Sequence, residues 1–527
     1  MILLRRLVAL LIAGLFMAVP GAAPADPGDI AAASRGVVRV VLIRSEGGSA
    51  SLVSHGTGFA IAPDLIVTNA HVVEDMRGDS AILAGVVPSE GRGGFAAQIV
   101  AYSRQRDLAL LRLRQGAALN ALTLFAGAPT DSEEVFAVGY PGNVDMAEGL
   151  SMSDLVSPQT AVKTRGYISA GRSSKAFDTI LHTAPIGAGN SGGPLLDACG
   201  RVLGVNSFGT VSDNGTDSAF YFAVSMREVA AFLKEAGITP HTSGLPCTSL
   251  ADLDRADAAR GADEQARLAA EAEARKAAQA AAAAKAQHDA ELQILAERDN
   301  GLALAAVLLV AALGAGAAAF MMAQRGKQRE LRIASGAAGV LLLAAVGTWL
   351  LRPPLSLIEE RAKDIVAEAQ ASARPPSEAS AAAGNGSPTG AGAAEKLVCV
   401  LDPQRSRVTV SDITDVPLTW GPAGCVNGRT QYGLAGDGWS RVLVPQSEAT
   451  ISVTRYDPAR HEYTVERFLM GLEAMTAARE ARAKLTPPAC GADDAAVRQF
   501  GTAQAAIRAS VPAEPNERLR YSCKPAP

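Results

Sequence analysis

Short apolar runs separated by Gly, Asn, Asp and Pro dominate the chain between its N-terminal leader and residue 245. Many short strands with turn signals between them predict a sandwich or barrel. One helix is expected to close this segment, with Ser225 and Glu228 as a capping box at its start and Gly237 as its stop. We therefore predict an all-β domain over residues 27–245. The runs that we read as strands include residues 37–43, 59–61, 65–67, 108–113, 135–138 and 202–205.

The first residues have the pattern of an export signal. Arg5 and Arg6 precede an apolar run over residues 7–19, and Ala-Pro-Ala at 23–25 is a small-x-small cleavage pattern. We predict a signal peptide over residues 1–25, with an uncleaved anchor as the alternative. Both interpretations place the following domain outside the cytoplasm.

Two apolar stretches in the middle of the chain, residues 301–324 and 333–351, contain no charged residue. Each is close to the roughly 20 residues that a membrane helix needs. The loop between them, residues 325–332, holds four basic residues, which predicts a cytoplasmic loop by the positive-inside rule. This orientation agrees with the export signal, because it leaves both large flanks outside. A buried hairpin of a soluble protein is the alternative.

The remaining segments differ in composition. Ala, Glu, Arg, Lys and Gln fill residues 250–299 and predict a helical stalk, although a partly frayed linker is equally compatible. Residues 352–395 become rich in Ala, Ser, Gly and Pro and predict a linker. Residues 396–527 regain Trp, Tyr and β-branched residues and predict a small α+β domain, with a helix over 465–484. The Gly–aromatic rhythm of residues 419–439 weakly resembles MORN-like hairpins of bacterial envelope proteins. It indicates a binding or sensing module, with a structural cap as the alternative.

Composition excludes several classes of protein. Hydrophobic residues make up 48% of the chain, which excludes a wholly disordered protein, and a net charge of −4 implies no cationic surface for nucleic acid. The sequence contains no C-x-x-C pair and no H-E-x-x-H, so we expect no metal site and no cofactor. An even number of cysteines fits an oxidising compartment, with free buried thiols as the alternative. Cys199 and Cys247 are a candidate disulfide, and three pairings are open among the other four, Cys399, Cys425, Cys490 and Cys523.

The most specific chemical motif is GNSGGP at residues 189–194. A serine between glycines at a tight turn fits a nucleophile, and the backbone N–H groups of Gly189 and Ser191 are candidates for an oxyanion hole. A serine needs a base, and the base needs an orienting acid. His71 and Asp107 lie upstream, in the order His, Asp, Ser that is known for this triad.

Two other motifs overlap the same residues, the dinucleotide fingerprint G-x-G-x-x-G and the hydrolase elbow G-x-S-x-G. Both require a helix directly after the motif. Residues 194–205 instead predict a strand, a turn and another strand, so both alternatives are disfavoured.

The predicted all-β domain that contains these residues resembles a trypsin-like serine protease, and within that superfamily the HtrA (Deg) group. The motifs GTGFAIAPDLIVTNAHVV, RDLALLRL, VGYPGN, GNSGGPLLD, GRVLGVNS and YFAVS occur in the expected order. The resemblance implies two β-barrels with the active site between them. It also implies His71 as general base, Asp107 as its orienting acid and Ser191 as nucleophile of an acyl-enzyme mechanism. No PDZ-like segment is recognisable after the closing helix, so substrate delivery by PDZ domains and trimerisation are not implied.

The sequence departs from the digestive proteases in two places. Asn190 stands directly before the serine where those enzymes have an acid, so their zymogen switch is not implied. Pro185 stands six residues before the serine where a protease specific for Arg or Lys has Asp. We therefore expect an apolar or small specificity pocket, formed by Pro185, Ile186, Phe208 and Ala223.

These observations predict a membrane-anchored serine endopeptidase of the bacterial inner membrane, with its protease and C-terminal domains in the periplasm. Its expected partners are protein or peptide substrates and the lipid bilayer, and its oligomeric state is left open. The alternative is a catalytically silent membrane scaffold or sensor that presents two exported binding domains.

Overall fold

The computed structural model describes residues 27–46, 49–115, 119–173, 177–210, 219–372, 394–436 and 438–526. The expected signal peptide, and the Ala-, Ser-, Gly- and Pro-rich part of the expected linker from residue 373 to 393, lie outside these ranges. The chain divides into two units, one formed by Met1–Asp257 with Ala391–Pro527 and the other by Ala258–Gly390.

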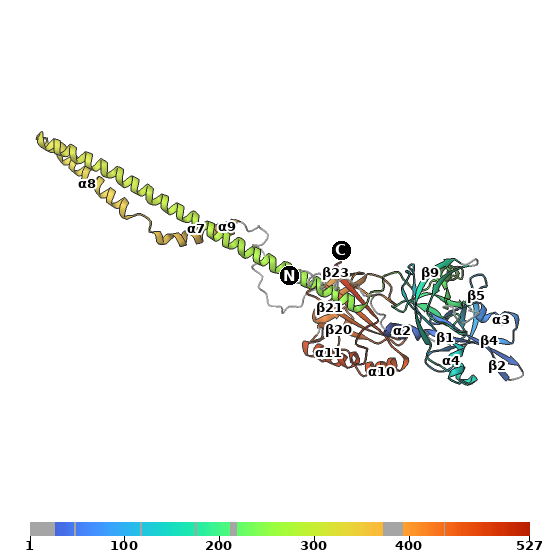
Figure 1. Cartoon of the computed structure of the whole chain (residues 1–527). Coiled ribbons are helices and arrows are strands. Elements are labelled where there is room, and N and C mark those ends of the chain that lie inside the picture. The colour runs from blue at the N-terminus through green and yellow to red at the C-terminus, as the bar shows by residue number, and fades with distance from the viewer. Residues whose placement is uncertain are drawn as a thin grey trace, which may run out of the picture. The chain divides into compact units, whose positions relative to one another are not determined.

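A closed antiparallel barrel occupies the first part of the protease segment (Figure 1). Its strand order is β1-β2-β3-β6-β5-β4, and the turn after β3 holds η1 (His71–Val73) and α3 (Asp75–Gly78). Small and β-branched residues allow close packing inside a narrow barrel. The strands are β1 (Val37–Glu46), β2 (Ser49–Ala62), β3 (Leu65–Thr68), β4 (Ile82–Pro88), β5 (Phe95–Ser103) and β6 (Leu108–Leu113).

A second barrel follows. Its sheet has the order β11-β8-β9-β10-β13-β12-β7-β14, and the additional pairing of β11 with β12 closes the first six of these strands. The all-β double-barrel fold predicted for the protease segment is therefore confirmed. The strands are β7 (Leu124–Phe125), β8 (Glu134–Gly139), β9 (Val162–Ser173), β10 (Asp178–His182), β11 (Pro194–Leu196), β12 (Val202–Gly209), β13 (Tyr221–Ser225) and β14 (Thr242–Ser243). The helices around them are α2 (Pro27–Ser34), α4 (Gly142–Ala147), α5 (Met152–Leu155) and α6 (Met226–Glu235).

One buried cluster holds the two barrels together. It takes side chains from both barrels and from α2 and α6, so the relative position of the barrels is set by apolar packing. Its members include Ile30, Phe59, Val67, Leu108, Val138, Val205, Val224 and Phe232.

The closing helix is α6, but the predicted capping box is wrong. Ser225 occupies the N-cap position, yet its side chain makes no capping hydrogen bond. Glu228 instead accepts hydrogen bonds from Arg106 Nε at 3.1 Å and from the backbone N–H of Asp178 at 3.2 Å. The glutamate therefore ties α6 to the turn before β6 and to the start of β10. Gly237, with φ of +71°, ends the helix as expected.

The C-terminal segment forms one antiparallel sheet with two helices. Its strand order is β18-β17-β16-β15-β23-β22-β21-β20-β19. The helix predicted over 465–484 is wrong in its first part, because residues up to 469 belong to β22, which pairs with both β21 and β23. The strands are β15 (Glu395–Leu401), β16 (Val416–Trp420), β17 (Cys425–Val426), β18 (Thr430–Gln431), β19 (Gly433–Ala435), β20 (Gly438–Leu443), β21 (Thr450–Asp457), β22 (Glu462–Leu469) and β23 (Glu517–Pro525), and the helices are α10 (Leu472–Ala483) and α11 (Asp494–Arg508).

All six cysteines are paired. Cys199 is bonded to Cys247 as expected, and of the three pairings open in the C-terminal domain the structure has Cys399–Cys523 and Cys425–Cys490. The first of these two bonds links adjacent strands, β15 and β23.

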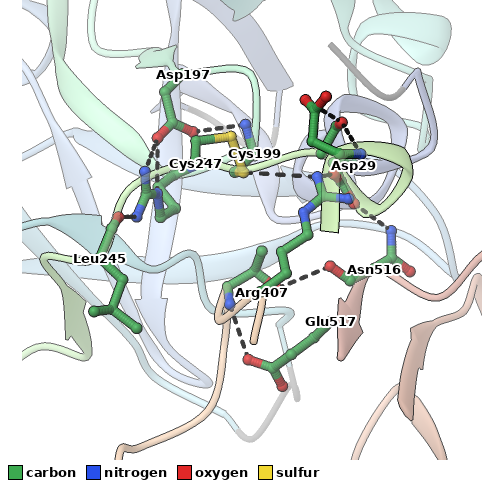
Figure 2. Close-up of a disulfide and its surroundings, with 12 residues drawn as sticks. Asp29, Asp197, Cys199, Leu245, Cys247, Arg407, Asn516 and Glu517 are labelled. Carbon is green, nitrogen blue, oxygen red and sulfur yellow. Dashed lines mark hydrogen bonds and ion pairs between the residues drawn. A yellow bond between two sulfur atoms is a disulfide. The ribbon is translucent and has the colours of Figure 1, made fainter. Parts of the chain in front are cut away.

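An arginine of the C-terminal domain is buried against the protease domain, beside the Cys199–Cys247 disulfide (Figure 2). Arg407 forms an ion pair with Asp29 of α2, and its guanidinium also lies 3.6 Å from the Cys199 sulfur. Asn516 Nδ2 donates to the same aspartate at 2.8 Å. Both charged side chains are at most 3% exposed. The two domains are thus joined through desolvated charges.

The second unit is helical. A single helix, α7 (Leu250–Gln324), contains both the expected stalk and the first apolar stretch, and its residues from Ala258 onward belong to this unit (Figure 1). A turn with Gly326 at φ of +70° leads into α8 (Gln328–Leu350). Part of the expected linker is helical, since α9 covers Ile358–Ser372. α7 and α8 are long and apolar enough to cross a membrane, judged by length and composition alone.

Candidate active site

His71 and Asp107 meet at the end of the first barrel. His71 opens η1 directly after β3, and Asp107 precedes β6 in the left-handed region, with φ of +53°. His71 Nδ1 lies 2.9 Å and 3.0 Å from the two carboxylate oxygens of Asp107, and the backbone N–H of His71 donates to the same carboxylate at 3.2 Å. Because the carboxylate attracts the Nδ1 proton, Nε2 is left as the basic nitrogen.

Ser191 lies on the turn between β10 and β11. Two glycines of this turn have positive φ, +99° at Gly189 and +87° at Gly192. A Cβ at Gly192 would lie 2.1 Å from the Thr57 carbonyl oxygen, so no larger residue fits there. Thr57 of β2 holds the turn from the other barrel: its backbone N–H donates to Ser191 O at 2.9 Å, and its Oγ1 donates to Gly189 O at 2.6 Å.

Ser207, on β12, connects the serine with the His–Asp pair. Ser191 Oγ donates to the Ser207 carbonyl at 2.9 Å, and Ser207 Oγ donates to Asp107 Oδ2 at 2.5 Å. In this conformation the Ser191 hydroxyl therefore donates to Ser207, and among the described residues no hydrogen bond joins it to His71. Ser191 and Asp107 are thus both bonded to Ser207, and His71 is bonded to Asp107, so the three residues singled out from the sequence belong to one hydrogen-bonded chain.

Two backbone amides of the serine turn have no acceptor among the residues that the structure describes. Within the described part of the chain, the N–H groups of Gly189 and Ser191 donate to no protein group, whereas those of Asn190, Gly192 and Gly193 all do. Unpaired, pre-oriented N–H groups beside a serine are what an oxyanion hole requires. The arrangement fits the role expected for these two amides.

The Asp107 loop is anchored by its neighbour. Arg106 donates to both carboxylate oxygens of Glu235 at 2.7 and 2.9 Å, and to Glu228 at 3.1 Å. The hydrogen bonds that Arg106 donates to Glu235 raise the pKa of Arg106, so the guanidinium stays charged. Because both glutamates belong to α6, these hydrogen bonds connect the Asp107 loop to the helix that follows the second barrel.

The expected pocket residues lie in different environments. Ile186 packs against the buried cluster that contains Ala223, and Phe208 stacks on Phe222 with 4.7 Å between ring centroids. Pro185 is exposed, and its carbonyl accepts a hydrogen bond from Thr164 Oγ1 at 2.6 Å. All four side chains are apolar.

Sequence reasoning missed several groups at this site, among them Ser207, Thr57, Asn69 and Arg106. Asn69 Nδ2 donates to the Asp107 carbonyl at 2.8 Å and so helps to hold the backbone of Asp107 in place. All four lie within or next to the quoted motifs, but residue type alone assigns them no role. Among the residues that the structure describes, no group of three or more His, Cys, Asp or Glu side chains is arranged to hold a metal ion.

Comparison with known proteins agrees with this geometry. Residues 56–205 match the family described as trypsin-like peptidase domain. The chain is 32% identical over 212 residues to the serine protease Rv3671c of Mycobacterium tuberculosis, a match that covers 40% of this chain and 49% of that protein. It is 32% identical over 199 residues to the magnetosome formation protease MamE of Paramagnetospirillum magneticum, covering 36% of this chain and 25% of MamE. It is also 32% identical over 187 residues to human serine protease HTRA4, covering 35% of each.

Among solved structures, the active form of Rv3671c is 26% identical and has a TM-score of 0.31, covering 42% of this chain and 91% of that chain. The chain thus spans half or less of the length of these curated relatives. Residues 56–205 are a trypsin-like peptidase domain, and the segment is similar to serine proteases of the HtrA type.

Proposed function

We propose that this chain is a membrane-anchored serine endopeptidase that cleaves proteins or peptides through an acyl-enzyme. The observation that carries the proposal is the convergence at Ser207, which bonds Asp107 through its hydroxyl and Ser191 through its carbonyl. A silent scaffold has no physical need for a His–Asp pair and a serine to share one bridging residue.

The proposed reaction begins with rotation of the Ser191 hydroxyl from the Ser207 carbonyl towards His71 Nε2. His71 then accepts the hydroxyl proton as Ser191 Oγ attacks the substrate carbonyl, and Asp107 stabilises the resulting imidazolium. The free amides of Gly189 and Ser191 bind the negative oxygen. His71 returns its proton to the leaving amine, and water hydrolyses the acyl-enzyme by the same steps.

The proposed preference is for an apolar or small residue before the scissile bond. Two observations support this preference. Position 185 holds Pro and not an acidic residue, and Ile186, Phe208 and Ala223 are apolar. A carboxylate at the wall of a specificity pocket is what selects Arg or Lys in this class of enzyme.

We further propose that α7 and α8 anchor the enzyme in a bacterial inner membrane, with both large domains in the periplasm. Tethering raises the local concentration of enzyme towards envelope proteins, which makes these the proposed substrates.

Fluorophosphonate labelling tests the enzyme against the silent scaffold. The full chain is expected to form one covalent adduct, because the reagent reacts with a serine that is activated by a base. Ser191→Ala should abolish labelling, whereas Ser157→Ala, at an exposed serine of the same domain, should leave it unchanged. A wild-type chain that stays unlabelled, or a Ser191→Ala chain that is still labelled, would contradict the proposal.

The membrane orientation is tested with alkaline phosphatase fusions, since this enzyme is active only after export. A fusion after Gln328 should be inactive, because the basic loop stays in the cytoplasm, and a fusion after Ser372 should be active. The reverse pattern would invert the topology, and activity at both positions would show that no helix crosses the membrane.

A further inference from the structure

Next to the serine turn lies a histidine that the proposed mechanism does not use. The Nε2 atom of His55, on β2, lies 3.3 Å from Asp145 Oδ2. The other carboxylate oxygen of Asp145 accepts a hydrogen bond from Arg39 Nη2 at 2.7 Å. The side chains of His55, Asp145 and Arg39 are 17%, 11% and 3% exposed. They come from β2, α4 and β1, so three separate elements converge on this point.

The imidazole of His55 lies beside Gly189, whose N–H has no acceptor among the described residues. A Cβ at Gly189 would lie 2.9 Å from His55 Nε2 and 2.3 Å from the Tyr140 carbonyl oxygen. A Cβ at Gly142, whose N–H donates to Ala188 O at 2.8 Å, would lie 3.3 Å from His55 Cε1. The ring therefore fills the space beside the two glycines that hold this part of the turn.

The surroundings of the His55 imidazole favour a structural role for this ring. Burial lowers the pKa of His55, which keeps the imidazole neutral at neutral pH. Arg39 is itself fastened: it donates to Gln159 Oε1 at 3.1 Å and lies 4.7 Å over the Tyr140 ring. Tyr140 OH in turn donates to Gln159 O at 2.9 Å. The aspartate that faces His55 thus belongs to a rigid network.

We propose that His55 is a positioning residue, whose imidazole, packed beside Asp145, keeps the backbone N–H of Gly189 aimed at the substrate oxygen. This inference rests on the proposed function, in which that N–H belongs to the oxyanion hole. Glycine has no side chain to restrict its backbone, and a residue with φ of +99° needs outside contacts to stay there. His55 supplies those contacts on one side and Thr57, which binds the Gly189 carbonyl, on another.

Steady-state hydrolysis of a peptide amide by the full chain tests this assignment. His55→Ala should lower kcat about 10-fold or more with KM changed less than about 2-fold, because the affected contact forms with the oxyanion in the transition state. His55→Gln, which keeps a polar side chain facing Asp145, should restore most of the loss. His241→Gln is the matched control, since His241 also faces a carboxylate, that of Asp412 at 3.1 Å, and should leave both constants unchanged.

Hydrogen exchange over residues 186–193 separates this inference from the proposed function. In His55→Ala the bonded amides of Asn190, Gly192 and Gly193 should exchange faster than in wild type, a result that does not require activity. If exchange is faster in His55→Ala but the wild-type chain hydrolyses no substrate, the positioning role is upheld and the proposed protease function is refuted. Unchanged exchange and unchanged kcat in a chain that Ser191→Ala inactivates would refute the positioning role and uphold the enzyme. Equal losses in the Ala and Gln variants would also refute it, because the role would then be packing alone.

Discussion

Asp107→Asn is expected to lower kcat by about 10,000-fold while the domain stays folded. The carboxylate now accepts the Nδ1 proton of His71 at 2.9 Å, so Nε2 is free to act as base. An amide in the same place would donate to Nδ1 and move the proton to Nε2, which leaves a tautomer that cannot take the serine proton. Asn is the matched replacement, because it tolerates the left-handed conformation of residue 107, where φ is +53°.

The measurement is kcat on a peptide amide, with circular dichroism to show that the fold is unchanged. Asp64→Asn is the control, since Asp64 is a half-exposed aspartate of the same barrel that faces Arg112 at 3.6 Å. It should change kcat by less than about 2-fold, as expected for a weak surface pair. Near-normal turnover in Asp107→Asn would show that His71 does not act as proposed.

Asp29→Asn is expected to destabilise the chain by about 3–5 kcal/mol. The substitution keeps the shape of the side chain but removes the negative charge that Asp29 places against the buried guanidinium of Arg407, beside the Cys199–Cys247 disulfide (Figure 2). Removing one member of a buried ion pair costs more than the pair itself contributes to stability. The double variant Asp29→Asn with Arg407→Met should therefore recover much of the stability that the single variant loses.

Denaturant unfolding measures this effect, and limited proteolysis reports whether the C-terminal domain separates from the protease domain. Glu74→Ala is the control: its partner Arg104 is 82% exposed at a distance of 3.2 Å, so the loss should stay within about 1 kcal/mol. A loss of that small size in Asp29→Asn, or no recovery in the double variant, would show that the buried pair does not join the domains.

Local pattern was sufficient to predict much of the fold. The apolar runs around Phe59, Leu108 and Val205 predict strands because they are short and are bounded by turn-forming residues. The structure has strands at all three places. The same reasoning failed at 465–469, where pairing of β22 with β21 and β23 decides for a strand over a helix. It failed again at Glu228, which pairs with Arg106, 122 residues away, and not with the start of its own helix.

The sequence by itself predicted an all-β domain and singled out His71, Asp107, Ser191 and Gly189, because those signals depend on neighbours along the chain and on the spacing of small residues at one turn. The arrangement as two barrels was implied by the resemblance to trypsin-like proteases. Only the tertiary structure decided that Ser207 links the serine to the aspartate, that His55 supports the turn, and that Arg407 reaches Asp29, 378 residues away. The physical reason is that such contacts depend on which strands pair and how the barrels pack, and the type of a residue does not specify its partner in space.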